Sequence, residues 1–109
     1  MWMNLGRDFT GRGRTPGALS DIARIEVLLA ETRAAFAADG PYLFGGTFGA
    51  TDAMFAPVVA RFLTWKPDLS AATKAYCQAV RSHPLVSTWY DAASAEPSSW
   101  LVEDYERAP

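Results

Sequence analysis

The sequence contains only one cysteine, Cys77, and one histidine, His83, among its 109 residues. One cysteine cannot form a disulfide within the chain, and the two residues together are too few for a cysteine and histidine zinc site. No apolar run reaches the roughly eighteen residues that a membrane span needs, and no basic stretch followed by an apolar one indicates a secretory signal. We therefore expect a cytoplasmic protein that does not enter a membrane.

The sequence also lacks an excess of positive charge. Ten Lys and Arg residues stand against twelve Asp and Glu residues, so the net charge is −2 and the pI is about 5.2. This balance argues against a nucleic-acid partner, because such proteins use basic surfaces to bind phosphates. Half of the residues are hydrophobic and a fifth are charged, which is typical of a globular protein. The length suits one domain over residues 1–109.

The stretch from 48 to 63 predicts a buried helix, because apolar side chains occur on nearly every face of it. These side chains are Met54, Phe55, Val58, Val59, Phe62 and Leu63. Gly49 is the predicted N-cap of this helix, and Asp52 follows at the third helical position. There the Asp52 carboxylate can accept a hydrogen bond from the Gly49 N–H and meets the positive end of the helix dipole. We interpret Asp52 as a folding residue rather than as a catalytic or metal-binding carboxylate.

Capping residues predict three further helices. Thr15 followed by Pro16 opens a helix that ends near Asp39, and its apolar stripe is expected to face the core. The stripe consists of Ile22, Ile25, Leu28, Leu29 and Phe36. Ser70 opens the next helix, and Pro84, capped by His83 or Ser82, opens the last. The pattern predicts an all-α bundle of about four helices around the central helix 49–63.

Two consecutive segments carry a resemblance to a known family. Pro41-Tyr-Leu-Phe-Gly-Gly46 and Phe48-Gly-Ala-Thr-Asp-Ala-Met-Phe-Ala-Pro57 resemble the C-terminal helical domain of bacterial glutathione S-transferases. The family pattern is a loop of the type FLFG, an apolar residue, Ser or Thr, two residues, Asp and a buried helix. Gly49 departs from it, because the family usually has Ser or Thr there. The resemblance runs from Met3 to about Tyr105, nearly the whole chain.

The resemblance implies the hydrophobic-substrate side of a protein whose complete form transfers glutathione to electrophilic substrates. It implies that Met3, Trp100 and Tyr105 form the wall of the substrate site. In the family, glutathione binds an N-terminal thioredoxin-like domain, which also stabilises the thiolate. No β-α-β pattern precedes the helices here. We therefore expect an N-terminally truncated domain that needs such a partner domain and neither binds glutathione nor reacts alone.

No group of residues in the sequence indicates catalysis or a metal site, and other functions stay open. Cys77 is expected to be a small core residue rather than a nucleophile. Arg7, Arg12 and Arg14 predict either a solvated loop or a clamp for phosphate or carboxylate groups. The alternative functions are a non-catalytic interaction module and a truncated gene product or expressed fragment without separate activity. Self-association, including a homodimer, is also expected if apolar surface is exposed.

Overall fold

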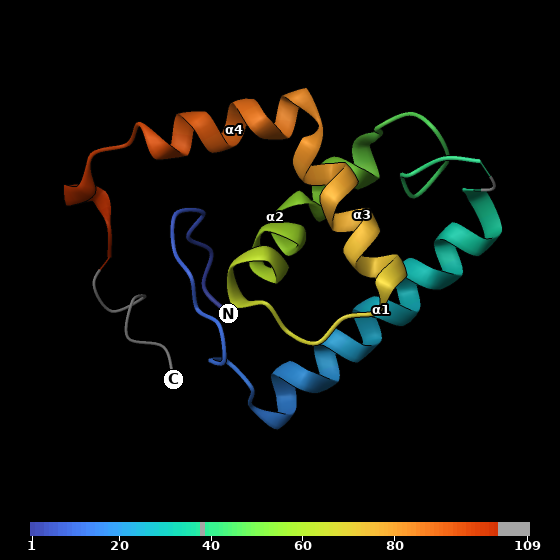
Figure 1. The fold of residues 1–109 in the computed structure, drawn as a ribbon, viewed down its shortest axis with the longest axis horizontal. Coiled ribbons are helices and arrows are strands. Elements are labelled where there is room, and N and C mark those ends of the chain that lie inside the picture. Colours follow the sequence, from blue (N-terminus) through green and yellow to red (C-terminus); the bar gives the residue numbers. More distant parts are fainter. Residues whose placement is uncertain (38, 103–109) are drawn as a thin grey trace.

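The computed structural model describes residues 1–37 and 39–102, and in this part of the chain it contains helices and no strand. The elements are α1 (Pro16–Phe36), α2 (Ala50–Trp65), α3 (Ala71–Ser82), α4 (Pro84–Ser94) and the short 3-10 helix η1 (Ser98–Trp100). Figure 1 shows α2 in the middle of the molecule, with the other helices and the N-terminal segment around it. The predicted all-α fold with four α-helices is thus confirmed.

The helices begin where the capping residues predict. The side-chain oxygens of Thr15 and Ser70 each accept a hydrogen bond from the backbone N–H three residues further on. His83 caps α4, since its Nδ1 accepts a hydrogen bond of 3.2 Å from the Leu85 N–H. The end of α1 differs from the prediction, because the helix stops at Phe36 and is capped by Ala37. The connection to α2 is therefore longer than expected.

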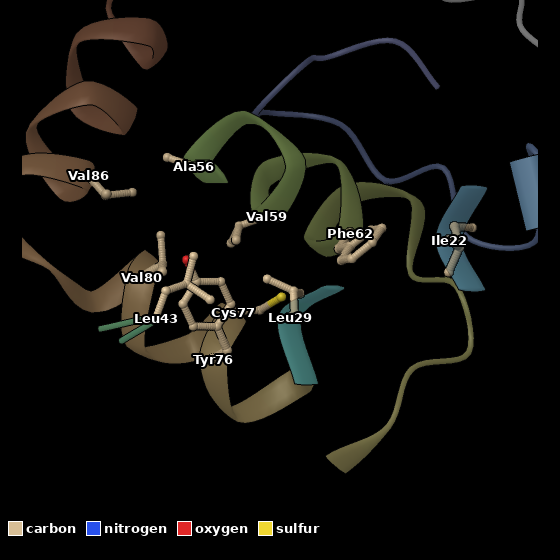
Figure 2. Close-up of a cluster of buried hydrophobic side chains, with 10 residues drawn as sticks. All are labelled: Ile22, Leu29, Leu43, Ala56, Val59, Phe62, Tyr76, Cys77, Val80 and Val86. Atoms are coloured by element: carbon tan, nitrogen blue, oxygen red, sulfur yellow. The ribbon is translucent and has the colours of Figure 1, made fainter. Parts of the chain in front are cut away.

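Ten side chains from all four helices and the connecting loop form one buried cluster (Figure 2). The cluster consists of Ile22, Leu29, Leu43, Ala56, Val59, Phe62, Tyr76, Cys77, Val80 and Val86. Removal of this apolar surface from water is the main force that holds the helices together. Cys77 lies inside the cluster and is 1% exposed, so it packs as a small hydrophobic residue.

Two predictions about which side chains are buried are wrong. Met54 is 80% exposed, so α2 is not buried on every side. It lies seven residues before the half-buried Arg61 and so on the same helix face, which the core cluster does not use. In α1, Leu28 and Phe36 are exposed rather than buried, because the core side of the helix is a narrow stripe through Ile22 and Leu29. Phe36 instead contacts the exposed ring of Phe44.

The N-terminal segment is only in part a solvated loop: residues 6–8, 10 and 11 are exposed, whereas Phe9 packs against the end of α2. Phe9 is 2% exposed and stacks on Trp65, with 4.3 Å between the ring centroids. The Arg14 guanidinium donates hydrogen bonds of 2.9 Å to the carbonyls of Trp65 and Lys66. These carbonyls lie at the negative end of the helix dipole, where a cation is stabilising. Arg14 therefore caps α2 and does not serve as an anion clamp.

Candidate hydrophobic binding site

The Asp52 carboxylate is fully buried and accepts three hydrogen bonds. Its Oδ2 accepts from the Gly49 N–H at 2.9 Å, and its Oδ1 accepts from the Leu43 N–H at 3.1 Å. Oδ1 also accepts from the Tyr76 hydroxyl at 2.9 Å. Burial and, second, this bond to Asp52 raise the pKa of Tyr76 above its ordinary value of 10.0. A carboxylate that is closed off from solvent and used by three donors stabilises the fold and leaves no room for a ligand.

The loop between α1 and α2 is held from two sides. On one side, the Arg33 guanidinium donates hydrogen bonds to the carbonyls of residues 40, 41 and 42. On the other side, Asp52 binds the Leu43 N–H. Within the loop, Gly40 lies so close to Gly45 that an added Cβ atom would be 1.9 Å from the Gly45 carbonyl carbon. Only glycine fits at position 40, and the loop is a fixed part of the core.

Phe48 joins the beginnings of α2 and α4. Its ring stacks on the His83 ring with 4.1 Å between the centroids, and Tyr42 packs edge-on against it. Phe48 stands just before the N-cap of α2, where a staple to the fourth helical residue is common. That residue is Ala53, which is exposed and small, so Phe48 packs against the N-cap of α4 instead. The direction of α4 is thereby tied to the core.

The far end of α4 borders a pocket of about 480 Å³, together with the N-terminal segment and η1. The pocket is lined by Met3, Asn4, Leu5, Gly6, Trp89, Ala93, Ser94, Glu96, Pro97, Ser98, Trp100, Leu101 and Val102. The structure thus brings together Met3 and Trp100, two of the three residues that the sequence suggested for a substrate wall. The third, Tyr105, lies outside the described residues. Figure 1 shows the chain running from α4 to η1 on one side of the N-terminal segment.

The wall of the pocket combines apolar and polar side chains. Met3 is 43% exposed and Trp100 is 67% exposed, so large apolar side chains face solvent there. Concave sites with exposed apolar walls and a few polar groups are typical ligand sites. The polar side chains are Asn4, Ser94, Glu96 and Ser98. No lining residue among those described is a histidine, lysine or arginine, so the wall offers the serines no histidine base and offers an anionic ligand no cation.

A second, smaller hollow of about 250 Å³ lies between α2 and α3, and Cys77 is part of its wall. Burial raises the pKa of the Cys77 thiol to about 11. The thiol is therefore protonated at neutral pH and is a poor nucleophile. Elsewhere in the described chain, no three residues of the types His, Cys, Asp and Glu come together as they do in metal sites.

Comparison with known families gives a match over most of the helices. Residues 17–92, well over half of the chain, match the C-terminal domain of glutathione S-transferase. The chain belongs to this family. The matched range covers most of the helical bundle of this glutathione S-transferase C-terminal domain. It includes Trp89, whereas Met3, Glu96 and Trp100 lie outside it.

Other comparisons give no further relatives. No curated protein and no solved structure matches the chain. Among the described helices of this glutathione S-transferase C-terminal domain, none has the length and apolar character that a membrane span requires.

Sequence reasoning missed Trp89 and Glu96 as pocket residues. The sequence did contain a signal for a binding wall at this end of the chain. The segment after α4 contains the apolar residues Pro97, Trp100 and Leu101, and the last two have exposed side chains. Apolar residues in such an end segment indicate either packing on the core or a binding wall.

Proposed function

We propose that this chain is the hydrophobic-substrate side of a glutathione S-transferase-like protein, which in its complete form transfers glutathione to electrophilic substrates. The observation that supports this most is the pocket with exposed Met3 and Trp100 side chains in a domain of this family. In the reaction, the glutathione thiol first loses its proton. The thiolate sulfur then attacks an electrophilic carbon, a carbon–sulfur bond forms, and the leaving group departs with its bonding electron pair.

Glutathione itself fits the pocket poorly. It carries two carboxylates, whereas the described lining contains Glu96 and no basic side chain. We therefore assign glutathione binding and thiol activation to a thioredoxin-like domain that acts together with this chain. The pocket then holds the electrophile beside the thiolate and excludes water from it, which accelerates the reaction by positioning. A reducing compartment such as the cytoplasm suits a reaction that needs a free thiol.

A second candidate function is a non-catalytic interaction module, and the surface of α1 favours it. Leu19 is 47% exposed and Val27 is 50% exposed. They are eight residues apart and lie on the same face of the helix. Exposed alanines at 23 and 30 continue this apolar face. Such a face binds a partner protein or a second copy of the chain more readily than it binds a small molecule.

The two candidates are separated by measuring conjugation with and without a thioredoxin-like glutathione domain. The purified chain alone is expected to give no conjugation of a chromogenic electrophile above the uncatalysed rate. Supplied with such a domain, by fusion or by mixing, it is expected to give turnover that saturates with electrophile. Trp100→Ala should then raise KM, whereas Leu19→Ala, on α1, should not. Saturable turnover by the chain alone, or equal kinetics of both variants, would contradict the proposal.

A further inference from the structure

The pocket lies at the C-terminal end of α4, where the helix dipole is negative. Ala93 and Ser94, in the last turn, line the pocket, and that turn contains no basic residue. The partial charge at a helix C-terminus is roughly half an elementary negative charge and acts within about one turn. The Arg14 guanidinium donates to carbonyls at the corresponding end of α2, whereas the carbonyls of residues 91, 92 and 93 in α4 accept hydrogen bonds from the backbone N–H groups of residues 95 and 96. The pocket therefore lies next to a negative helix end whose own last turn carries no cation.

The polar side chains around the pocket add further negative charge or hydrogen-bond acceptors. Glu96 lines the pocket directly, and the exposed Asp91 belongs to the last turn of α4. The Ser94 hydroxyl donates its proton to the Tyr90 carbonyl at 2.9 Å, so only its acceptor lone pairs remain for a ligand. The basic residue nearest in sequence is Arg7, which follows Gly6 but does not line the pocket. Among the described residues that line the pocket, Glu96 is thus the only charged one, and its carboxylate favours positive charge.

Two indole side chains complete the site. Trp89 and Trp100 both line the pocket, one from α4 and one from η1. The face of an indole carries negative charge from its π electrons and is the strongest aromatic partner for a cation. It also stacks well on flat apolar rings. Indoles combined with a carboxylate and a helix C-terminus are suited to a ligand that is both aromatic and positively charged.

We propose that the pocket selects a flat aromatic cation, such as an N-alkylated heteroaromatic ring, over neutral or anionic molecules of the same size. This inference rests on the proposed function only in making that cation the electrophilic substrate. Binding itself requires nothing beyond the present chain. The indoles supply apolar contact for any flat ring, and the negative field supplies the discrimination between charges.

Three probes of nearly equal shape separate charge from hydrophobic contact. They are N-methylquinolinium, which is a cation, 1-methylnaphthalene, which is neutral, and 1-naphthoate, which is an anion. Equilibrium dialysis against the purified chain at low ionic strength gives each Kd. We expect the cation to bind about tenfold more tightly than the neutral probe and the anion to bind most weakly. Equal affinities, or tighter binding of the anion, would overturn the inference.

Variants assign the preference to the pocket. Glu96→Gln should weaken binding of the cation several-fold and leave the neutral probe unchanged. The matched control is Glu31→Gln, which makes the same change of charge at an exposed position of α1 and should affect neither probe. Trp100→Ala should weaken both probes. If Glu96→Gln behaves like Glu31→Gln, the carboxylate does not select the charge and the inference is wrong.

These outcomes are independent of the transferase test. A protein that conjugates neutral electrophiles, while this chain shows no preference for cations, refutes only the charge selection. A chain that prefers cations, while no conjugation occurs with any glutathione-binding domain, refutes only the transferase proposal.

Discussion

The carboxylate of Asp52 and the carboxylate in the pocket at the end of α4 differ in burial and in hydrogen bonding. Asp52 is 0% exposed, and hydrogen bonds from Leu43, Gly49 and Tyr76 use both of its oxygens. Glu96, by contrast, is exposed and lines a pocket beside an indole that is 67% exposed. The first carboxylate is satisfied by the protein itself, and the second is left for solvent or a ligand.

This difference separates a residue that stabilises the fold from one that we propose acts in ligand binding, within one small domain. A buried charge is tolerated only when donors within the protein replace its hydration, and its loss is then felt by the whole core. An exposed charge beside exposed indoles adds little to folding, yet it acts on any molecule that enters the pocket. Changes near Asp52 should therefore alter stability, and changes in the pocket should alter affinity.

Removal of the Asp52 carboxylate should have a large effect on the free energy of unfolding. Asp52→Ala leaves the Leu43 N–H, the Gly49 N–H and the Tyr76 hydroxyl without their acceptor in the core. Each unsatisfied group costs about 1–3 kcal/mol, and because these costs overlap we expect the free energy of unfolding to fall by about 3–5 kcal/mol. Urea denaturation followed by circular dichroism measures this loss.

Tyr76→Phe is the control for Asp52→Ala, because it removes one of the three donors and keeps the carboxylate. We expect a loss of about 1–2 kcal/mol for it. If Asp52→Ala leaves the chain unfolded in water, Asp52→Asn provides the measurement, since its single carbonyl oxygen retains part of the bonding. A loss for Asp52→Ala no greater than that for Tyr76→Phe would remove the distinction between the two regions.

Alkaline pH should also lower the free energy of unfolding, and it should do so through groups buried in the core rather than through the pocket. Burial raises the pKa of Cys77 from 9.0 to about 11, and it raises that of Tyr76 above 10.0. The folded state thus holds both protons more tightly than the unfolded state. The resulting stability is fully present below pH 9 and is lost as the pH rises through about 11.

The urea midpoint should therefore fall between pH 9 and about 11, and Cys77→Ala should make this fall shallower. A midpoint that stays constant over this range in the unmodified chain would mean that neither buried group titrates with unfolding. A fall of the same steepness in Cys77→Ala would exclude the thiol as its source.

Local signals made the helices predictable. Pro16 and Pro84 stand at first helical positions, and Thr15 and His83 precede them as caps, so each helix start is determined by adjacent residues. The bond from the Gly49 N–H to Asp52 spans only three residues, so it too could be inferred from sequence. The Tyr76 bond spans 24 residues and depends on how α2 and α3 pack. Sequence alone could not supply that contact.

The pocket was only partly predictable for the same reason. Met3 and Trp100 were suggested by family resemblance, whereas periodicity gave no indication that they meet. The charge of the site depends on where α4 ends. Glu96 becomes a pocket residue only because that end of α4 borders the N-terminal segment. Exposure of Met54 was likewise unpredictable, because an apolar sequence does not show which helix faces have neighbours.

An intermediate effect is expected where the core and α4 meet. His83→Ala removes the acceptor for the Leu85 N–H and the ring that stacks on Phe48. We expect a loss of about 1–2 kcal/mol in the free energy of unfolding. His83→Asn keeps a side-chain cap and should recover part of the loss. If the alanine and asparagine variants unfold at the same urea concentration, capping by His83 contributes nothing and only the stacking remains.

The smallest effect on stability is expected in the pocket, and two tryptophans make the comparison direct. Trp65 is 1% exposed, stacks on Phe9, and donates its indole N–H to the Trp2 carbonyl at 2.9 Å. Trp65→Ala should therefore cost about 3–5 kcal/mol. Trp100 already has 67% of its surface in water, so Trp100→Ala should cost less than about 0.5 kcal/mol.

Ligand affinity should reverse the order of the two tryptophans. Under conditions in which both variants are folded, dialysis with a flat aromatic probe should show a larger loss of binding by Trp100→Ala than by Trp65→Ala, because Trp65 does not line the pocket and acts on it only through the N-terminal segment. This holds because an exposed indole stabilises the folded chain little but gains contact area when a ligand covers it. A large loss of stability in Trp100→Ala would show that its indole packs as a core residue. The two regions would then differ in exposure without differing in role.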